Sequence, residues 1–329
     1  MGKDIIFPAE WHPQSAIQLT WPHENSDWNY LLDEVTACFV EIAKSIIRHQ
    51  DLIIVCKDSS SVKSRLGDIT EYKGKIRLVE IPSNDTWARD HSGISVFIDG
   101  EKAVYDFTFN GWGLKFAADL DNQITKKLFD KGIFSEKIGR INKKNFALEG
   151  GALESDGKGT LLTTSECLLS PNRNSFLDKG QIEDFLKENL GLDRILWLDH
   201  GYLAGDDTDS HIDTLARFCD EHTIAYVKCG DENDEHFNAL KAMEEQLKSF
   251  VDREGKPYRL IPLPMAETVE MDGERLPATY ANFLILNKAV LVPVYGSELD
   301  KVAISELQKA FPEKEISGVN CLTLIKQHG

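Results

Sequence analysis

The stretch GDDTDSHIDTLARF, residues 205–218, shapes both the local architecture of this chain and its chemistry. It places four aspartates and one histidine within positions 206–213, and an apolar run follows them directly. Carboxylates rarely enter a protein interior unless a positive group meets them there. We therefore predict that this segment forms the wall of a site for an organic cation or a metal ion.

The composition is that of an ordinary globular protein, with 329 residues of which 42% are hydrophobic and 28% charged. Its formal net charge of −17 argues against nucleic acids and anionic membranes as partners. The sequence contains no run of 18 apolar residues, and the apolar run that follows Met1 is too short for a signal peptide. We predict a cytoplasmic protein, and homo-oligomer formation stays open.

The six cysteines are scattered along the chain, and no two of them form a CxxC pair. This spacing fits neither a disulfide framework nor a zinc ribbon. We expect five of them to be inert thiols in apolar surroundings, namely Cys38, Cys56, Cys167, Cys219 and Cys229. The remaining one, Cys321, is the candidate nucleophile.

Hydrophobic periodicity predicts helices that alternate with short strands and hairpins along the whole chain. The predicted helices cover residues 30–50, 59–66, 120–129, 179–190, 234–250 and 300–311. The predicted strands cover residues 17–21, 51–56, 76–81, 93–98, 102–106, 152–154, 160–164, 195–198, 224–228, 259–262, 281–286 and 289–294. This mixture argues against a purely parallel sheet. The recurrence of a strand pair followed by a helix indicates a structural repeat, and the lack of linkers predicts one domain over residues 1–329.

Four further segments combine reactive side chains with turn-forming neighbours: residues 83–91, 109–113, 147–151 and 317–323. Loops at strand ends are the usual place for binding and catalytic groups. We interpret the segment around Cys321 as a glycine-bearing turn. For Asp85, Asp206 and Asp209 we predict turn or capping roles rather than chemistry.

Two mechanisms compete for the aspartate-rich segment. In the first, His211 and Asp213 are metal ligands of a hydrolase, but the other histidines supply no H-x-H or HExxH set. In the second, carboxylates receive an organic cation and a cysteine attacks it. The second mechanism uses the separated Asp, Glu, His and Cys segments in full, and we favour it.

Taken together, the motifs resemble those of the agmatine deiminase and bacterial-type peptidylarginine deiminase family. The similar segments are WARD (87–90), LEGG (148–151), GDDTDSHID (205–213), the late Cys321, and PAEW (8–11) with Trp21-Pro22 near the start. They occur in the family's order across nearly the whole chain. The resemblance implies an α/β fold of the pentein type, a five-bladed propeller of strand-pair and helix units with pseudo-fivefold symmetry.

The resemblance also implies roles for eight residues in a hydrolase that deiminates a small cationic guanidino substrate. Cys321 is expected to be the nucleophile and His211 the general acid and base. Asp90 and Asp213 are expected to hold the guanidinium nitrogens, with Glu149 beside the histidine. The expected substrate-channel residues are Trp87, Asp207 and, as a weaker candidate, Trp112. No metal or organic cofactor is implied.

One motif departs from the family pattern, since Asn320 stands where a histidine commonly precedes the nucleophile. This leaves the substrate open. We expect agmatine, converted to N-carbamoylputrescine in polyamine metabolism and putrescine biosynthesis. The alternatives are arginine in peptides, an amidinotransferase reaction, and a non-catalytic binder of guanidinium compounds.

Overall fold

The computed structural model of the protein describes residues 4–68 and 73–328. Contacts between Cα atoms divide the chain into two compact units. Unit 1 comprises residues 1–5 and 13–150, and unit 2 comprises residues 6–12 and 151–329. The single domain over residues 1–329 stays a prediction. The signal-peptide prediction falls partly on residues 1–3, which lie outside the described part.

Unit 1 begins with a three-stranded parallel sheet in the order β2-β3-β4, with one α-helix in the described part of each connection. The elements are β2 (Ala16–Thr20), α1 (Leu32–Ile47), β3 (Asp51–Cys56), α2 (Ser59–Leu66) and β4 (Ile76–Glu80). The side chain of Asp58 caps α2 by accepting the N–H groups of Ser60 and Ser61. Helix α1 buries an apolar stripe against β3, as its periodicity predicts.

The second sheet of unit 1 contains a hairpin and a third, parallel strand. Asp99 and Gly100 join β5 to β6 with positive φ values of 51° and 81°, which matches the predicted turn. The elements are α3 (Ala88–His91), β5 (Ile94–Ile98), β6 (Glu101–Thr108), α4 (Gly111–Leu114), α5 (Ile124–Asp130) and β7 (Gly139–Ala147). Short β1 (Ile5–Ile6) and η3 (Gly150–Ala152) stand where the chain crosses between the units.

Unit 2 repeats this pattern in three sheets, each with an antiparallel pair and then a parallel strand after one or more helices. The first contains β8 (Glu154–Ser155), β9 (Thr160–Thr164), α6 (Ser165–Leu168), α7 (Pro171–Asn174), α8 (Lys179–Leu190) and β10 (Arg194–Leu198). The second contains β11 (Ala216–Asp220), β12 (Thr223–Lys228), α9 (Phe237–Ser249) and β13 (Arg259–Pro264). The third contains β16 (Leu284–Ile285), β17 (Ala289–Val294), α10 (Leu299–Ala310) and β18 (Glu315–Asn320).

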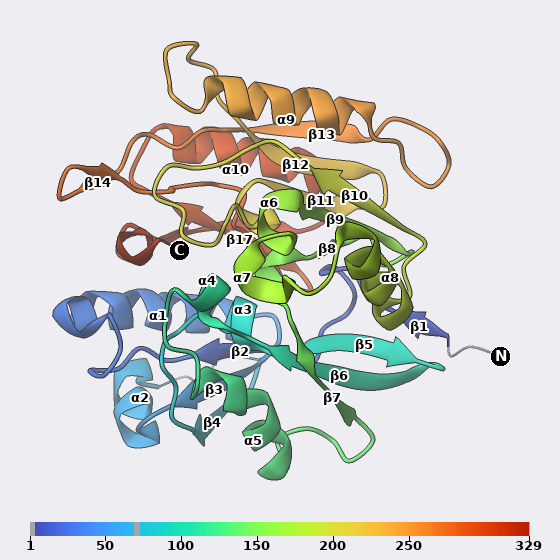
Figure 1. Ribbon diagram of the computed structural model, residues 1–329. Coiled ribbons are helices and arrows are strands. Elements are labelled where there is room, and N and C mark those ends of the chain that lie inside the picture. The colour runs from blue at the N-terminus through green and yellow to red at the C-terminus, as the bar shows by residue number, and fades with distance from the viewer. Residues whose placement is uncertain (1–3, 69–72, 329) are drawn as a thin grey trace. The chain divides into compact units, whose positions relative to one another are not determined.

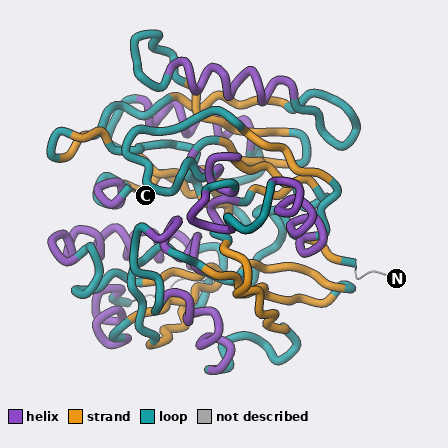
Figure 2. Tube along the Cα trace, in the orientation of Figure 1, coloured by secondary structure: helices purple, strands orange, loops and turns teal. Residues whose placement is uncertain are grey.

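Helices α9 and α10 both pack against β12, which lies in the middle of its sheet (Figure 1). A separate small hairpin consists of β14 (Glu270–Met271) and β15 (Glu274–Arg275). Figure 2 shows the same alternation of helices and strands through both units. The predicted α/β mixture of hairpins and helices is confirmed, and none of the described helices is long and apolar enough to cross a membrane.

Several predicted boundaries are wrong, and the segment before the candidate nucleophile is the most consequential correction. Residues 315–320 form strand β18 rather than a turn, in parallel register with β17. Gly318 serves close packing, because a Cβ there would lie 3.0 Å from a methyl group of Val294. The predicted strands over 152–154 and 281–286 shrink to two residues each, and the helix predicted from 234 begins at Phe237.

Candidate active site

In unit 2 the aspartate-rich segment is a tight turn that Asp206 organises. Its Oδ1 accepts the hydroxyl and the N–H of Thr208 at 2.6 and 3.3 Å, and its Oδ2 accepts the Ser210 N–H at 2.7 Å. The hydroxyl of Thr208 in turn accepts the His211 N–H at 3.1 Å. The predicted turn role of Asp206 is confirmed, and its consequence is a fixed backbone at His211.

The turn holds two residues in the left-handed region, Asp209 at φ 65° and Ser210 at φ 59°. Buried Arg173 donates to the Asp209 carboxylate at 2.5 Å and to the Thr208 carbonyl at 2.9 Å. The Thr164 hydroxyl donates to the Ser210 carbonyl at 2.8 Å. These bonds offset the cost of the unusual backbone. The cation that meets Asp209 is therefore a residue of the protein itself.

The residues after the turn enter the interior, as the apolar pattern predicts. His211 and Asp213 are 2% and 3% exposed, while Ile212, Leu215 and Phe218 are fully buried. A single turn of 3₁₀ helix, η4 (Ile212–Thr214), carries Asp213. Asp207 is half-buried, like its neighbours in the turn.

Cys321 directly follows β18 and is 8% exposed. Its N–H donates to the Val294 carbonyl at 3.0 Å, which extends the β17–β18 pairing by one residue. The adjacent Tyr295 lies close enough that Cys321 contributes, after burial, to raising the pKa of its phenol. The thiol therefore sits at the carboxyl end of a strand, where side chains are commonly presented to a site.

Tyr295 and Thr279 connect the strand end that bears Cys321 to the segment that bears Asp213. The Tyr295 hydroxyl donates to the Thr279 carbonyl at 2.9 Å and accepts the Thr279 N–H at 3.1 Å. The Thr279 hydroxyl donates to the carbonyl of Thr214 at 2.9 Å. Thr214 is the neighbour of Asp213, so buried hydrogen bonds link the strand end that bears Cys321 to the turn that bears Asp213.

Three of the other cysteines are poor nucleophiles for a physical reason. Burial raises the pKa of Cys56 to about 11 and also raises the pKa of Cys219 and of Cys229. A thiol with a raised pKa is protonated at neutral pH, and the thiolate is the reactive form. This agrees with the prediction that these cysteines are inert.

In unit 1, helix α3 begins directly after Trp87 and carries Asp90. The Oδ2 of buried Asp90 accepts the indole N–H of Trp112 at 3.0 Å. Trp112 itself has a left-handed backbone with φ 54° and stacks edge-on against Phe109 at 4.9 Å between ring centroids. A non-glycine residue in this region is a cost that the aromatic packing and the hydrogen bond offset. Trp112 thus orients Asp90, a contact that the sequence did not predict.

Glu149 follows β7 and is completely buried. The next residue, Gly150, passes so close to α3 that a Cβ would lie 2.0 Å from the Arg89 carbonyl oxygen. Only glycine fits this approach. The Glu149 segment is therefore held against the helix that presents Asp90.

Asp85 fixes the two tryptophans next to this helix, a role that its sequence position did not reveal. Its Oδ1 accepts the indole N–H of Trp28 at 3.1 Å and its Oδ2 accepts that of Trp87 at 3.2 Å. Asp121 accepts the N–H of Asn84 at 2.8 Å and that of Asp85 at 3.3 Å. Burial raises the pKa of Asp85 to about 6 and that of Asp121 to about 7.

These two carboxyl groups predict a stability that decreases as the pH rises. Because burial raises both pKa values, the folded state binds more protons than the unfolded state between about pH 4 and about pH 7. The free energy of unfolding is therefore expected to fall across this range, by on the order of a few kcal/mol at most. Urea denaturation of wild type and Asp121→Asn measures the slope, which should be shallower in the variant.

Asp130→Asn is the matched control for this slope, because Asp130 is an exposed residue paired with Lys126. Its profile should follow that of wild type. An Asp121→Asn profile as steep as that of wild type would contradict the raised pKa of Asp121.

Unit 2 contains a buried ionic cluster that is centred on Arg217 and interacts electrostatically with Asp213. The Arg217 guanidinium is fully buried and pairs with Glu154 through Nε and with Glu10 at 2.8 Å. It also donates to the carbonyls of Ala281 and Phe283 at 3.2 and 2.6 Å. Burial alone would lower the pKa of Arg217, but Glu154, Glu10 and Asp213 together raise it. Arg217 is therefore a permanent cation beside Asp213.

The eight predicted site residues divide evenly between the two units. Unit 1 contains Trp87, Asp90, Trp112 and Glu149, and unit 2 contains Asp207, His211, Asp213 and Cys321. The sequence did not single out Arg217, Tyr295 or Thr279. A signal existed for Glu10 alone, which lies in the PAEW motif.

The similarity of this chain to known proteins extends over almost its entire length. The family described as Porphyromonas-type peptidyl-arginine deiminase matches residues 6–329. A solved protein from Porphyromonas gingivalis, provisionally described as an arginine deiminase, is 56% identical with a TM-score of 0.95, covering 99% of this chain and 95% of its own. An agmatine deiminase from C. jejuni with substrate bound is 40% identical with a TM-score of 0.92, covering 100% and 94%. The agmatine deiminase of Stutzerimonas stutzeri is 34% identical, covering 94% of this chain and 88% of its own.

Proposed function

The chain belongs to the Porphyromonas-type peptidyl-arginine deiminase family, and on that premise we propose that it hydrolyses agmatine to N-carbamoylputrescine and ammonia. It is an enzyme of the deiminase type that acts on guanidino groups. The observation that carries the choice of agmatine is the 40% identity, over the whole chain, to an agmatine deiminase solved with its substrate.

The proposed chemistry begins with orientation of the substrate. A guanidinium is a poor electrophile, since its charge is spread over three nitrogens and it stays protonated at physiological pH. The carboxylates of Asp90 and Asp213 accept its N–H groups and fix its plane. The hydrogen bond from Trp112 supports the role of Asp90, because it orients that carboxylate. The buried cation of Arg217 supports the role of Asp213, because it interacts electrostatically with that residue.

The covalent steps need one thiolate and one proton carrier. The Cys321 thiolate attacks the guanidinium carbon, and His211 protonates the departing nitrogen, which leaves as ammonia. An amidino-cysteine remains. His211 then deprotonates a water molecule that attacks the same carbon, and the C–S bond breaks to release the ureido product and the thiolate. Glu149 supports His211, Trp87 and Asp207 line the way to the site, and no metal or organic cofactor takes part.

We also propose that the sheets form the blades of a five-bladed pentein-type propeller. Among the described residues, five sheets have three or more strands, two in unit 1 and three in unit 2. Four of the five contain an antiparallel pair and a parallel strand reached through helices, and one of these four also includes the short β1. This recurrence is what a pseudo-fivefold repeat predicts.

A second function has its own support, since the matching family is described by peptidyl-arginine deimination. Purified protein is therefore to be assayed with agmatine, an arginine-containing peptide and free arginine at equal concentration. We expect ammonia and ureido product from agmatine, with a kcat/KM at least roughly tenfold above that of the peptide. A higher kcat/KM with the peptide would identify peptidyl-arginine, and not agmatine, as the substrate.

Two further outcomes of this assay would reject the hydrolase itself. Product formation only with an added amine acceptor would identify an amidinotransferase. Calorimetric binding of agmatine with no turnover at any pH would identify a non-catalytic binder. Loss of activity on addition of a chelator would instead support the hypothesis of a metal hydrolase.

A further inference from the structure

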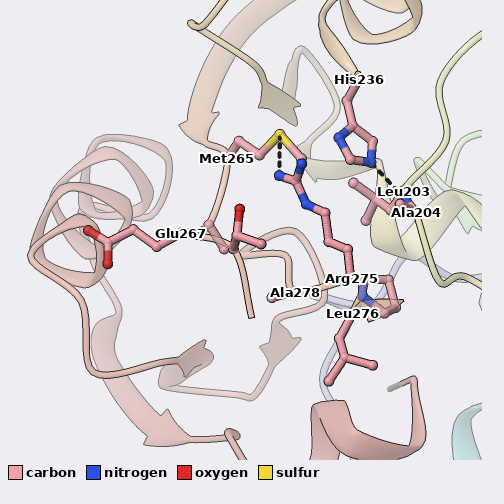
Figure 3. Close-up of a pocket in the computed structure, with 11 residues that line it drawn as sticks. Leu203, Ala204, His236, Met265, Glu267, Arg275, Leu276 and Ala278 are labelled. Atoms are coloured by element: carbon pink, nitrogen blue, oxygen red, sulfur yellow. Dashed lines mark hydrogen bonds between the residues drawn. The ribbon is translucent and has the colours of Figure 1, made fainter. Parts of the chain in front are cut away.

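A buried histidine outside the predicted catalytic set holds the backbone immediately before the aspartate-rich turn. The Nε2 of His236, which is 1% exposed, faces the backbone of Ala204 (Figure 3). It accepts the Ala204 N–H at 2.8 Å. The next residue, Gly205, accepts a hydrogen bond at its carbonyl from Nδ1 of His328. Two histidines from distant segments therefore hold consecutive residues of one loop.

The contacts of His236 determine its protonation. A backbone N–H can only donate, so Nε2 must carry no proton. The neutral ring then carries its proton on Nδ1, which donates to Asp234 at 2.7 Å. The other oxygen of Asp234 pairs with Arg275 at 2.9 Å, and Arg275 also contacts Glu235 at 3.6 Å. Asp234 thus fixes the tautomer that can hold Ala204.

The path from Ala204 to His211 is short and rigid. Gly205 has φ 82°, and a Cβ there would lie 2.3 Å from the Arg275 carbonyl oxygen, so the backbone packs directly against Arg275 and only glycine fits. Asp206 donates its N–H to the Leu203 carbonyl at 3.1 Å and, with Thr208, orders the turn up to the His211 N–H. Hydrogen bonds and close packing therefore connect Ala204 to His211.

We propose that His236 is a positioning residue that places His211 for proton transfer, a role that rests on the proposed function of His211. The bond from the Ala204 N–H to Nε2 is the contact on which this role depends. The charged and titratable groups that face the ring are Asp234, Arg275 behind it, Glu235, and Tyr202, whose ring centroid is 5.0 Å away.

Two substitutions at His236 distinguish the bond with Ala204 from the bond with Asp234. In His236→Gln the side-chain oxygen reaches the Nε2 position and still accepts the Ala204 N–H. In His236→Asn the amide reaches only the Nδ1 position, which keeps the bond to Asp234 and loses Ala204. His222→Gln is the matched control, because His222 also pairs with an aspartate, Asp252 at 2.7 Å, but is 54% exposed.

The measurements are agmatine kinetics and hydrogen–deuterium exchange of the peptide that contains Ala204. His236→Asn should lower kcat roughly tenfold or more with KM changed by less than about threefold, and His236→Gln should stay within about threefold of wild type. At about pH 7.5 the amides of this peptide should exchange faster in His236→Asn than in wild type, and in neither of the other two variants. Protection of this peptide in His236→Gln and His222→Gln should match that of wild type.

Equal kinetics of His236→Asn and His236→Gln, or equal protection of Ala204 in both, would overturn the positioning role. Circular dichroism and thermal melting show whether either variant has lost its fold, and the retained activity of His236→Gln decides the matter if His236→Asn melts early. If wild type turns over none of the three substrates, the proposed function fails. The exchange measurement then still decides whether His236 holds the loop.

Discussion

A Cys321→Ala variant is expected to release ammonia from agmatine at least roughly 10⁴ times more slowly than wild type. The proposed reaction forms a carbon–sulfur bond before the C–N bond breaks, so without the thiolate there is no covalent route. Cys321 ends β18 and its N–H is anchored to Val294 at 3.0 Å, so removing only the sulfur should leave the strand in place. Initial rates of ammonia release at saturating agmatine measure the loss.

Cys219→Ala is the matched control for this variant. Cys219 is also buried in unit 2, and burial raises the pKa of its thiol, so it supplies no thiolate at neutral pH. Its replacement should leave kcat within about threefold of wild type. Mass spectrometry of acid-quenched turnover mixtures should place the amidino adduct on the peptide that contains Cys321. Full activity of Cys321→Ala, or an adduct on another cysteine, would contradict the covalent mechanism.

Local patterns were sufficient for most of the secondary structure. Strand β3 and helices α2 and α8 have the bounds that their apolar runs and caps predict. The hairpin at Asp99-Gly100 follows from turn chemistry alone. These elements are predictable because the local sequence of each carries a strong signal, which is an apolar run in β3, capping residues in the two helices, and a turn pair in the hairpin.

Strands that depend on distant partners were missed. The polar sequence of β7 shows no alternation that marks a strand, and it exists because it pairs in parallel with β6. Strand β18 has a glycine at position 318 that reads as a turn, yet its pairing with β17 and its packing on Val294 make it extended. Parallel pairing brings together segments that are far apart in the sequence, so no local pattern reports it.

The candidate site shows the same division. The motifs identified the residues expected to do chemistry, and the turn role of Asp206 is confirmed by its bonds to Thr208 and Ser210. The residues that orient them were not predictable. Glu10 and Arg217 stand 207 positions apart, and only the folded chain brings them together.

Replacing Arg217 by methionine is expected to lower the free energy of unfolding by about 3–5 kcal/mol. The guanidinium is 0% exposed and contacts Glu154 and Glu10, whose side chains are 5% and 13% exposed. Methionine fills similar space, so the loss reports the charge rather than a cavity. Two buried carboxylates would remain without the cation that compensates their desolvation. Urea denaturation followed by circular dichroism measures the change.

The charge argument makes a sharper prediction for the triple variant Arg217→Met, Glu10→Gln and Glu154→Gln. It removes both anions with the cation, while the glutamine oxygens still accept the N–H groups of Phe218 and Ile285 that the carboxylates accept now. A buried ion pair contributes little net stability against a neutral replacement, so this variant should regain most of the loss. Arg253→Met, which breaks an exposed pair with Asp193, should cost no more than about 1 kcal/mol. If the triple variant is as unstable as Arg217→Met alone, the arginine stabilises unit 2 through its packing on Phe283, 4.6 Å from the ring centroid, and not through its charge.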